Sequence, residues 1–227
     1  MRIAVYDCVS PDQLTEKYGP SGNHILRWLA PHAPEAELVR LDLPGGDALP
    51  SPTDYDGVVI SGSEKGVYDD THWMNPLRQN LLDLRAAGTP VFGICFGHQI
   101  MADVWGGKAE KADTGFVAGV RRFGFDDAVI PAYVAHQDQV TRQPPASRVT
   151  GAAGYCPIAG LAYDFPALSV QFHPEYNRAF ADDLITMFGD MLMSKEEISA
   201  SRDSLEEPVD SLLCGAQAAD LFRSRIT

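Results

Sequence analysis

The sequence predicts an α/β fold, an open and mostly parallel sheet with helices on both faces, a small antiparallel extension and a helical C-terminal tail. Two observations support this prediction. In the first half of the chain, short uninterrupted apolar runs alternate with segments of helical periodicity, which is typical of parallel strands covered by helices on both faces. From Lys108 to Phe125 the sequence becomes rich in glycine and alternates apolar with polar residues, which favours antiparallel hairpins.

The parallel part of the sheet is expected from four short strands. They are predicted at Arg2–Asp7, Ala36–Leu41, Asp56–Ile60 and Pro90–Ile94. The accompanying helices are predicted at Gly22–Ala30, Met74–Ala87 and Gln99–Trp105. Pro31 ends the first of these helices, and Gly88 stands where a left-handed C-cap would end the second. Strands and helices that alternate in this way place helices on both faces of an open sheet.

The second half of the chain is expected to add antiparallel strands and the C-terminal helices. Beyond the hairpins, strands are predicted at Ala132–Ala135, Arg148–Gly151 and Leu168–Phe172. Ala179–Met193 has the periodicity of an amphipathic helix. The tail that follows is more polar and predicts one helix over Val209–Phe222. We therefore expect a main domain over residues 1–193 and a helical extension over residues 194–227 that packs on the same domain.

Composition excludes several kinds of partner. The 227 residues include 18 Lys and Arg against 31 Asp and Glu, a formal net charge of −13. Binding to nucleic acids or anionic membranes depends on Lys and Arg, and the chain has no basic stripe, so neither is expected. No apolar run approaches the roughly 20 residues of a membrane span, and the N-terminus has no signal-peptide pattern. We therefore predict a cytoplasmic protein. The four cysteines form no metal-like cluster, and neither a metal nor another cofactor is expected.

The segment Val91–Gln99 carries the strongest functional signal. Its core, Gly93-Ile-Cys95-Phe-Gly97, follows a buried strand and precedes a helix, which is the cysteine form of a nucleophile elbow. Both glycines are needed because a Cβ atom there would collide with the adjoining strand or helix. The turn places the Cys95 sulfur at a helix N-terminus, where free N–H groups and the helix dipole favour a thiolate.

A thiolate nucleophile needs a base, and the base needs an orienting group. Of the six histidines, His173 is the best candidate because it directly follows a predicted strand. Pro174 favours an extended backbone at His173. Glu175 lies two residues further on, close enough to bind the imidazole and fix its tautomer. The expected catalytic triad is therefore Cys95, His173 and Glu175.

These segments resemble a known family. Gly93–Gln99 (GICFGHQ) and Gln171–Glu175 (QFHPE) are similar to the two signature blocks of class I, triad-type glutamine amidotransferases. Gly57–Ser63 (GVVISGS) resembles the family's oxyanion loop, and Ala135–Val140 (AHQDQV) resembles its glutamine-contacting loop. Ser63–Trp73 is similar to stand-alone members that are like the amidotransferase domain of GMP synthase. The resemblance implies a flavodoxin-like amidotransferase domain that covers most of the chain up to residue 193.

The resemblance also implies roles for single residues. Cys95 would attack the glutamine side-chain amide and form a γ-glutamyl thioester, with His173 as general base and acid and Glu175 orienting it. The remaining roles are an oxyanion hole formed by the N–H groups of Phe96, Gly62 and Ser63, and contacts to the glutamyl part from Gln99, Gln137 and Asp138. Ser63 stands where the family usually has a glycine with unusual backbone angles, which predicts a differently shaped oxyanion loop.

Three functions stay open at the level of the sequence. The first is an enzyme that hydrolyses glutamine to glutamate and ammonia for a separate synthetase, since the chain has no nucleotide-binding P-loop of its own. The second is a self-sufficient γ-glutamyl peptidase or hydrolase that uses the same triad on another leaving amine. The third is a non-catalytic binding or regulatory module, against which the intact triad argues. The expected ligand is thus glutamine or a γ-glutamyl small molecule. The sequence leaves open the acceptor, the pathway, the role of the tail and whether the chain forms a homo-oligomer.

Overall fold

The computed structural model describes residues 1–125, 128–209 and 212–225. Its strands are β1 (Arg2–Asp7), β2 (Glu37–Asp42), β3 (Gly57–Ile60), β4 (Val91–Ile94), β5 (Lys108–Lys111), β6 (Val117–Phe125), β7 (Ala128–His136), β8 (Asp138–Arg142), β9 (Ser147–Ala153), β10 (Cys156–Tyr163) and β11 (Ala167–Val170). Its helices are α1 (Gln13–Tyr18), α2 (Gly22–Leu29), α3 (Met74–Ala87), α4 (Phe96–Val104), α5 (Arg178–Leu192), α6 (Lys195–Ser204) and α7 (Leu212–Arg223).

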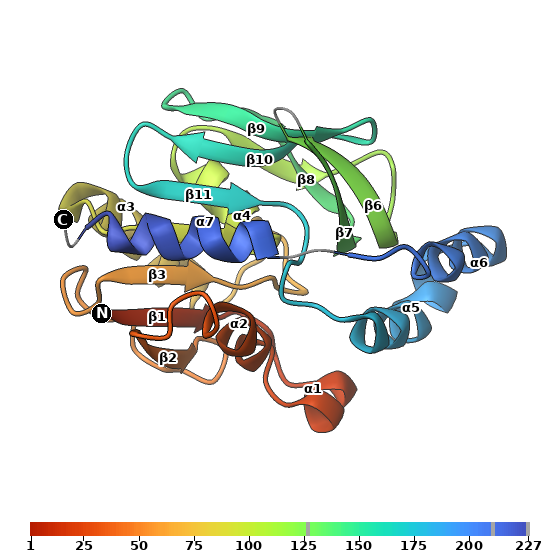
Figure 1. Ribbon diagram of the computed structural model, residues 1–227, viewed down its shortest axis with the longest axis horizontal. Coiled ribbons are helices and arrows are strands. Elements are labelled where there is room, and N and C mark those ends of the chain that lie inside the picture. The colour runs from red at the N-terminus through yellow and green to blue at the C-terminus, as the bar shows by residue number, and fades with distance from the viewer. Residues whose placement is uncertain (126–127, 210–211, 226–227) are drawn as a thin grey trace.

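The main sheet has the order β2-β1-β3-β4-β11-β10-β9-β6-β7 in the described part of the chain. The first five strands of this order are parallel neighbours. Figure 1 shows α2 and α7 on one face of these strands and α3 and α4 on the other. The predicted α/β class, with an open sheet covered on both faces, is confirmed. The carboxyl ends of β1, β3, β4 and β11 meet at one edge, which is where ligands bind in sheets of this type.

The antiparallel extension is built from β10, β9, β6 and β7. The expectation of hairpins within Lys108–Phe125 is wrong in its pairing. β5 pairs with β8 in a separate sheet, whereas β6 pairs with β7, because both partners lie further along the chain. β10 has no predicted counterpart, because Pro157 and Gly160 interrupt its strand pattern. The predicted strand Ala132–Ala135 covers only part of β7.

Most helices lie where their periodicity predicts them. α3 has the expected bounds, and Gly88 is a left-handed C-cap with φ 65° and ψ 25°. α4 begins at Phe96, three residues before the predicted start. α1 was not predicted. This short helix contains no buried residue and is held by a capping box, in which the Asp12 side chain accepts from the Thr15 N–H and Thr15 accepts from the Asp12 N–H.

The polar tail forms two helices rather than one. α7 agrees with the predicted helix over Val209–Phe222, of which residues 210 and 211 lie outside the described residues. It packs so closely on the sheet that a Cβ atom on Gly57 of β3 would lie 2.2 Å from the Phe222 ring. α6 was missed; it packs against α5 and β6. The proposed division into residues 1–193 and 194–227 stays a prediction.

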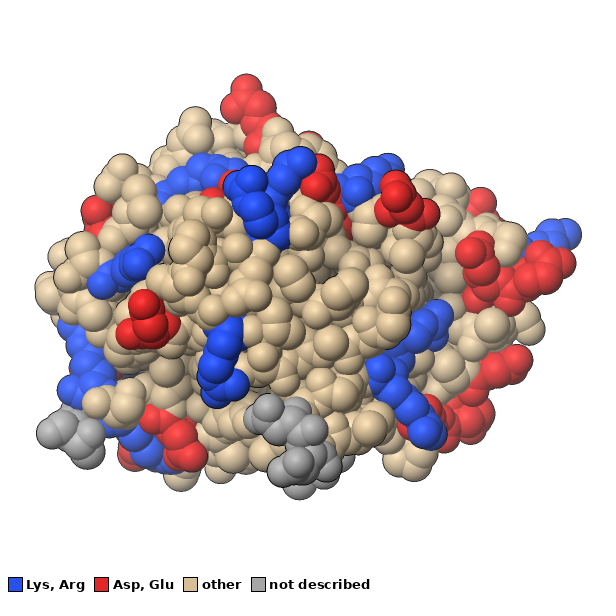
Figure 2. All heavy atoms as spheres, turned by 90° about the horizontal axis from the view of Figure 1, so that it is seen from above, with Lys and Arg blue, Asp and Glu red and all other residues tan. Residues whose placement is uncertain are grey.

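The surface carries both signs of charge. Figure 2 shows Lys and Arg side chains spread over one face, whereas acidic side chains gather at the end of the molecule where α5 and α6 lie. None of the helices in the described part of the chain combines the length and the apolar composition that a membrane span requires.

His98 ties α4 to the sheet and carries a prediction about acid stability. Its Nε2 lies 3.0 Å from the Ile158 carbonyl oxygen and its Nδ1 lies 2.8 Å from Ser169 Oγ. The neutral ring therefore donates from Nε2 and accepts at Nδ1. Burial lowers the pKa of His98 to about 4.

An unfolded chain takes up a proton at this histidine near its ordinary pKa of about 6.5, while the folded chain does not until about pH 4. We expect His98 to make the free energy of unfolding fall by about 1.4 kcal/mol per pH unit as the pH drops through this window. Urea unfolding between pH 7 and pH 4.5 measures the slope. His98→Gln should lower this slope by about 1.4 kcal/mol per pH unit, the contribution of one proton. His72→Gln, at an exposed position, is the control. An unchanged slope in His98→Gln would contradict the assignment.

Candidate active site

Cys95 lies at the sharp turn between β4 and α4. Its backbone has φ 51° and ψ −101°, and among the described residues it is the only non-glycine with a positive φ. The Cys95 N–H donates to the Val170 carbonyl oxygen at 2.9 Å, which ties the turn to β11. The side chain is buried, with 4% exposed. A strained, over-determined backbone of this kind is typical of functional sites, and the predicted elbow is present.

The glycines that flank the elbow are required by close packing. A Cβ atom on Gly93 would lie 2.4 Å from the Met101 sulfur and 2.7 Å from the Gly97 backbone. A Cβ atom on Gly97 would lie 2.4 Å from the Ile60 carbonyl oxygen of β3. Both collisions involve the adjoining helix or strand, as the sequence analysis expected.

Gly97→Ala should therefore displace the elbow, because the colliding atom belongs to the backbone of β3 and cannot rotate away. We expect a loss of about 2–3 kcal/mol in the free energy of unfolding, as for other overpacked sites, together with a loss of activity. Thermal and urea unfolding measure the first effect. Gly154→Ala is the control, because this exposed glycine has open space around it and, like Gly97, no positive φ. A Gly97→Ala protein as stable as the wild type would contradict the packing argument.

His173 is held opposite Cys95 by three contacts. Its N–H donates to the Tyr133 carbonyl oxygen at 2.8 Å, and its Nδ1 lies 2.7 Å from Glu175 Oε1. The Tyr176 ring stacks on the imidazole, with the ring centroids 3.9 Å apart and the planes at 5°. The Glu175 contact places the Nδ1 proton, so Nε2 is the atom available for proton transfer. The predicted pairing of His173 with Glu175 is present.

The surroundings of His173 favour its protonated form. Burial alone disfavours the imidazolium, but the Glu175 carboxylate and Cys95 outweigh this effect and raise the pKa of His173 to about 10. The imidazole is thus buried as a cation between a carboxylate and a thiol, an arrangement that activates a cysteine as a nucleophile.

The loop after β3 lies close to both Cys95 and His173. A Cβ atom on Gly62 would lie 2.8 Å from His173 Cε1 and 3.7 Å from Cys95 Cβ. Ser63 has no positive φ; its hydroxyl donates to the Cys8 carbonyl oxygen at 2.7 Å and accepts from the Lys65 N–H at 3.1 Å. These contacts fix the loop without a glycine at position 63. Phe96 is the first residue of α4, where an N–H has no acceptor within the helix.

On the opposite side of Cys95, the side chains of Gln99 and Gln171 and the backbone of Asp138 form a connected group. Gln99 Nε2 donates to the Asp138 carbonyl oxygen at 2.7 Å and to Gln171 Oε1 at 3.3 Å. Gln171 Nε2 in turn lies 3.6 Å from the Cys95 sulfur. Asp138 Oδ1 accepts from the Tyr68 hydroxyl at 3.2 Å, and burial raises the pKa of this carboxyl. Since the Gln99 amide nitrogen is already used, a substrate contact from Gln99 falls to Oε1.

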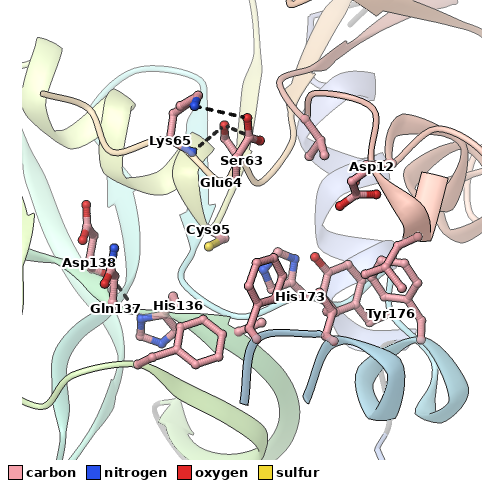
Figure 3. Close-up of a pocket in the computed structure, with 18 of the residues that line it drawn as sticks. Asp12, Ser63, Glu64, Lys65, Cys95, His136, Gln137, Asp138, His173 and Tyr176 are labelled. Carbon is pink, nitrogen blue, oxygen red and sulfur yellow. Dashed lines mark hydrogen bonds and ion pairs between the residues drawn. The ribbon is translucent and has the colours of Figure 1, made fainter. Parts of the chain in front are cut away.

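These groups line one cavity, shown in Figure 3. Cys95 lies between Gln137 and Asp138 on one side and His173 and Tyr176 on the other. The cavity has an empty volume of about 1020 Å³, including space open to solvent. Of the predicted site residues, those that line it are Ser63, Cys95, Gln99, Gln137, Asp138 and His173. Glu175, Gly62 and Phe96 are not part of the lining, although each is next to Cys95 or His173 in the sequence or by contact. Among the described residues, no group of three or more His, Cys, Asp or Glu side chains is arranged to hold a metal ion.

Comparison with known proteins gives the family. The sequence model described as glutamine amidotransferase class-I matches residues 23–187. The chain belongs to the class I glutamine amidotransferase family. It is therefore an enzyme of the amidotransferase type, as the sequence resemblance implied, and the alternative of a non-catalytic module is not supported.

Two kinds of relative of this amidotransferase are similar in sequence. Gamma-glutamyl peptidase 3 of Arabidopsis thaliana is 30% identical over 168 residues, which cover 67% of this chain and 68% of the relative. The GMP synthase [glutamine-hydrolyzing] of Aromatoleum aromaticum is 34% identical over 142 residues, which cover 52% of this chain but only 25% of the relative. The chain thus spans about a quarter of the GMP synthase.

Solved structures agree with the amidotransferase fold. A glutamine amidotransferase from Thermotoga maritima has a TM-score of 0.69 at 18% identity and covers 99% of this chain and 96% of its own. A glutamine amidotransferase from Methylobacillus flagellatus has a TM-score of 0.70 at 18% identity and covers 98% of this chain and 92% of its own. At this identity the likeness concerns the fold.

The structure adds three residues to this amidotransferase site that the sequence analysis did not single out. Gln171 contacts the Cys95 sulfur, and Tyr176 stacks on His173. His136 lines the cavity, and its Nδ1 lies 3.0 Å from the Asp138 carbonyl oxygen. Burial lowers the pKa of His136 to about 3, so this ring is neutral and donates to that carbonyl. Gln171 and His136 lie within quoted motifs, but the motif gave no signal of their contacts.

Proposed function

We propose that the chain hydrolyses the side-chain amide of γ-glutamyl compounds, of which glutamine is the simplest, through a thioester on Cys95. The Cys95 thiolate attacks the side-chain carbonyl carbon, and the C–N bond breaks as His173 Nε2 gives its proton to the leaving amine. Water then attacks the thioester while His173 takes one of its protons. Glutamate leaves, and the Cys95 thiolate and the His173 imidazolium are restored. Glu175 keeps the imidazole oriented and stabilises its charge.

The neighbouring groups fit the other needs of this reaction. The N–H groups of Phe96, Gly62 and Ser63 are the proposed donors to the oxyanion that forms on the carbonyl oxygen. We assign the glutamyl part to the side of the cavity that contains Gln99 Oε1, Gln137 and Asp138. The Asp138 carboxylate suits the α-ammonium group of the substrate, because the two charges are opposite and the site is largely buried.

One observation carries this proposal: a cysteine with strained backbone at a helix N-terminus faces a buried histidine that is paired with a carboxylate at 2.7 Å. The names of the relatives, a gamma-glutamyl peptidase and a glutamine-hydrolysing GMP synthase, support both versions of the function. In the first version, ammonia released from glutamine serves a separate synthetase. In the second, the chain acts alone on a γ-glutamyl compound with a larger leaving amine.

A product screen on the isolated chain tests the proposal and separates its versions. Glutamine, γ-glutamyl peptides and γ-glutamyl amides are offered in turn, and free glutamate is measured. Rapid release from a larger γ-glutamyl compound supports the self-sufficient hydrolase. Release from glutamine alone, or only after a synthetase is added, supports the ammonia-supplying version. Release that persists unchanged in Cys95→Ala would overturn the proposed chemistry.

A further inference from the structure

The cavity continues beyond the reacting groups along helix α5. Four apolar side chains spaced four residues apart line it, namely Phe180, Leu184, Phe188 and Leu192. Side chains at this spacing share one face of a helix, and twelve residues of α-helix span about 18 Å. The exposed fraction rises along this face from 6% at Phe180 to 45% at Leu192. The face therefore forms the floor of a groove that opens toward solvent. We call it the α5 groove.

The α5 groove has apolar walls from two other parts of the chain. Leu14 of α1 and Phe116, which precedes β6, line the same cavity. The Phe116 and Phe188 ring centroids are 6.0 Å apart. At the inner end, Phe180 contacts Tyr176 with centroids 4.6 Å apart, and Tyr176 stacks on His173. An unbroken series of aromatic contacts thus leads from the imidazole into the groove.

The position of the groove relative to Cys95 indicates what it holds. Gln137 and Asp138 lie on one side of Cys95, and His173 and Tyr176 lie on the other. If the glutamyl part occupies the first side, the amide nitrogen points toward His173, which must protonate it. Whatever substituent that nitrogen carries then extends past Tyr176 into the α5 groove. Ammonia from glutamine would leave this space unused.

The charges around the groove indicate the chemical class of this substituent. Apart from the catalytic imidazolium of His173, Lys65 is the only cation that lines the cavity among the described residues, and its Nζ lies 3.8 Å from Glu64 Oε1. The outer end of the groove is bordered by the acidic region of α5 and α6 visible in Figure 2. An anionic leaving group, such as the carboxylate of a released amino acid, would have no cation on the apolar walls. Outside them it would meet α5 and α6, on which acidic side chains outnumber basic ones although some are ion-paired. An uncharged apolar group is favoured.

We propose that the α5 groove is a leaving-group subsite and that the enzyme hydrolyses γ-glutamyl amides of apolar, aryl-substituted amines. The inference rests on the proposed function and names its substrate class. In each turnover the Cys95 thioester replaces the C–N bond, His173 Nε2 supplies the proton that turns the amide nitrogen into the free amine, and water releases glutamate. The amine is held by contact with the groove until it departs.

Two substrates that differ mainly in apolar reach test the subsite: γ-glutamyl ethylamide and γ-glutamyl 4-phenylbutylamide. For the wild-type chain we expect kcat/KM at least about tenfold higher for the phenylbutylamide, since each well-packed apolar group adds roughly a factor of ten or more to discrimination. Leu184→Ala should lower the ratio of the two values about fivefold to tenfold. Met187→Ala, a comparable truncation on α5 at a side chain that does not line the cavity, is the matched control and should leave the ratio unchanged.

Leu14→Ala is the second variant, because α1 contains no buried residue and the chain should fold without this side chain. It should lower the same ratio about threefold or more. Equal kcat/KM for the two amides, or a ratio that neither variant changes, would overturn the inference while leaving the proposed function in place.

Failure of the proposed function looks different. If neither amide is hydrolysed, the chain is treated with a diazoketone analogue of glutamine, which alkylates a reactive thiol, and the modified residue is identified by mass spectrometry. Labelling of Cys95 that glutamine prevents would retain a glutamine site and overturn only the leaving-group subsite. The absence of labelling at Cys95 would overturn both.

Discussion

Cys95→Ala should abolish hydrolysis of every γ-glutamyl substrate that the wild-type chain accepts, with kcat reduced on the order of 10⁴-fold or more. The reason is that no thioester can form, and the remaining groups supply only binding and oxyanion contacts, which contribute far less than the complete triad. Glutamate release measures the loss. The mass spectrum of wild-type protein incubated with substrate should show a covalent adduct of about 129 Da, the mass that a γ-glutamyl group adds by acyl transfer. This adduct should be absent from Cys95→Ala.

The fold should persist in Cys95→Ala. The substitution removes only the sulfur, and alanine experiences the same strain at φ 51° as cysteine does, so the melting temperature should change little. Cys214→Ala is the matched control, since Cys214 is also buried but lies on α7, on one face of the sheet and away from the cavity. It should retain full activity. Undiminished turnover in Cys95→Ala, or an equal loss in Cys214→Ala, would contradict the assignment of the nucleophile.

The elbow could be predicted because its determinants are local. Gly93 and Gly97 flank the cysteine within five residues, and the structure explains both by contacts with the directly adjoining α4 and β3. The pairing of His173 with Glu175 spans only two residues and is likewise visible in the sequence. The start of α4 was placed too late because Cys95 itself, with its positive φ, ends the strand and begins the helix. Hydrophobic periodicity carries no information about such a backbone angle.

Contacts between distant segments could not be predicted. The Phe180 ring of α5 lies 5.2 Å from the Tyr18 ring of α1, although the two residues are far apart in sequence. The four-residue spacing on α5 was visible as a helix, but an apolar face on a helix is usually buried in a core. Only the fold shows that this face meets α1 incompletely and leaves a groove. The same limit applies to Gln171, whose contact with Cys95 depends on the neighbouring positions of β4 and β11.

His173→Ala should lower kcat/KM more than Glu175→Ala does. Without His173 nothing protonates the leaving amine or deprotonates the attacking water, and we expect a loss on the order of 10⁴-fold. Glu175 acts through the imidazole: one oxygen binds Nδ1 at 2.7 Å, while Oε2 has no hydrogen-bond partner among the described residues. Its removal costs orientation and charge stabilisation, for which we expect on the order of 10²-fold.

The pH profile separates this role from simple structural support. The Glu175 carboxylate is a main reason why the pKa of His173 is raised to about 10. Without that carboxylate the effect of burial, which lowers the pKa, is opposed less strongly, so the imidazolium is lost at lower pH. If the active form pairs an imidazolium with a Cys95 thiolate, the alkaline limb of kcat/KM in Glu175→Ala should move toward lower pH. Glu175→Asp should restore part of both the rate and the profile. A larger loss of kcat/KM in Glu175→Ala than in His173→Ala would mean that the two roles are assigned the wrong way round. An alkaline limb that does not move in Glu175→Ala would show that Glu175 does not act through the charge of His173.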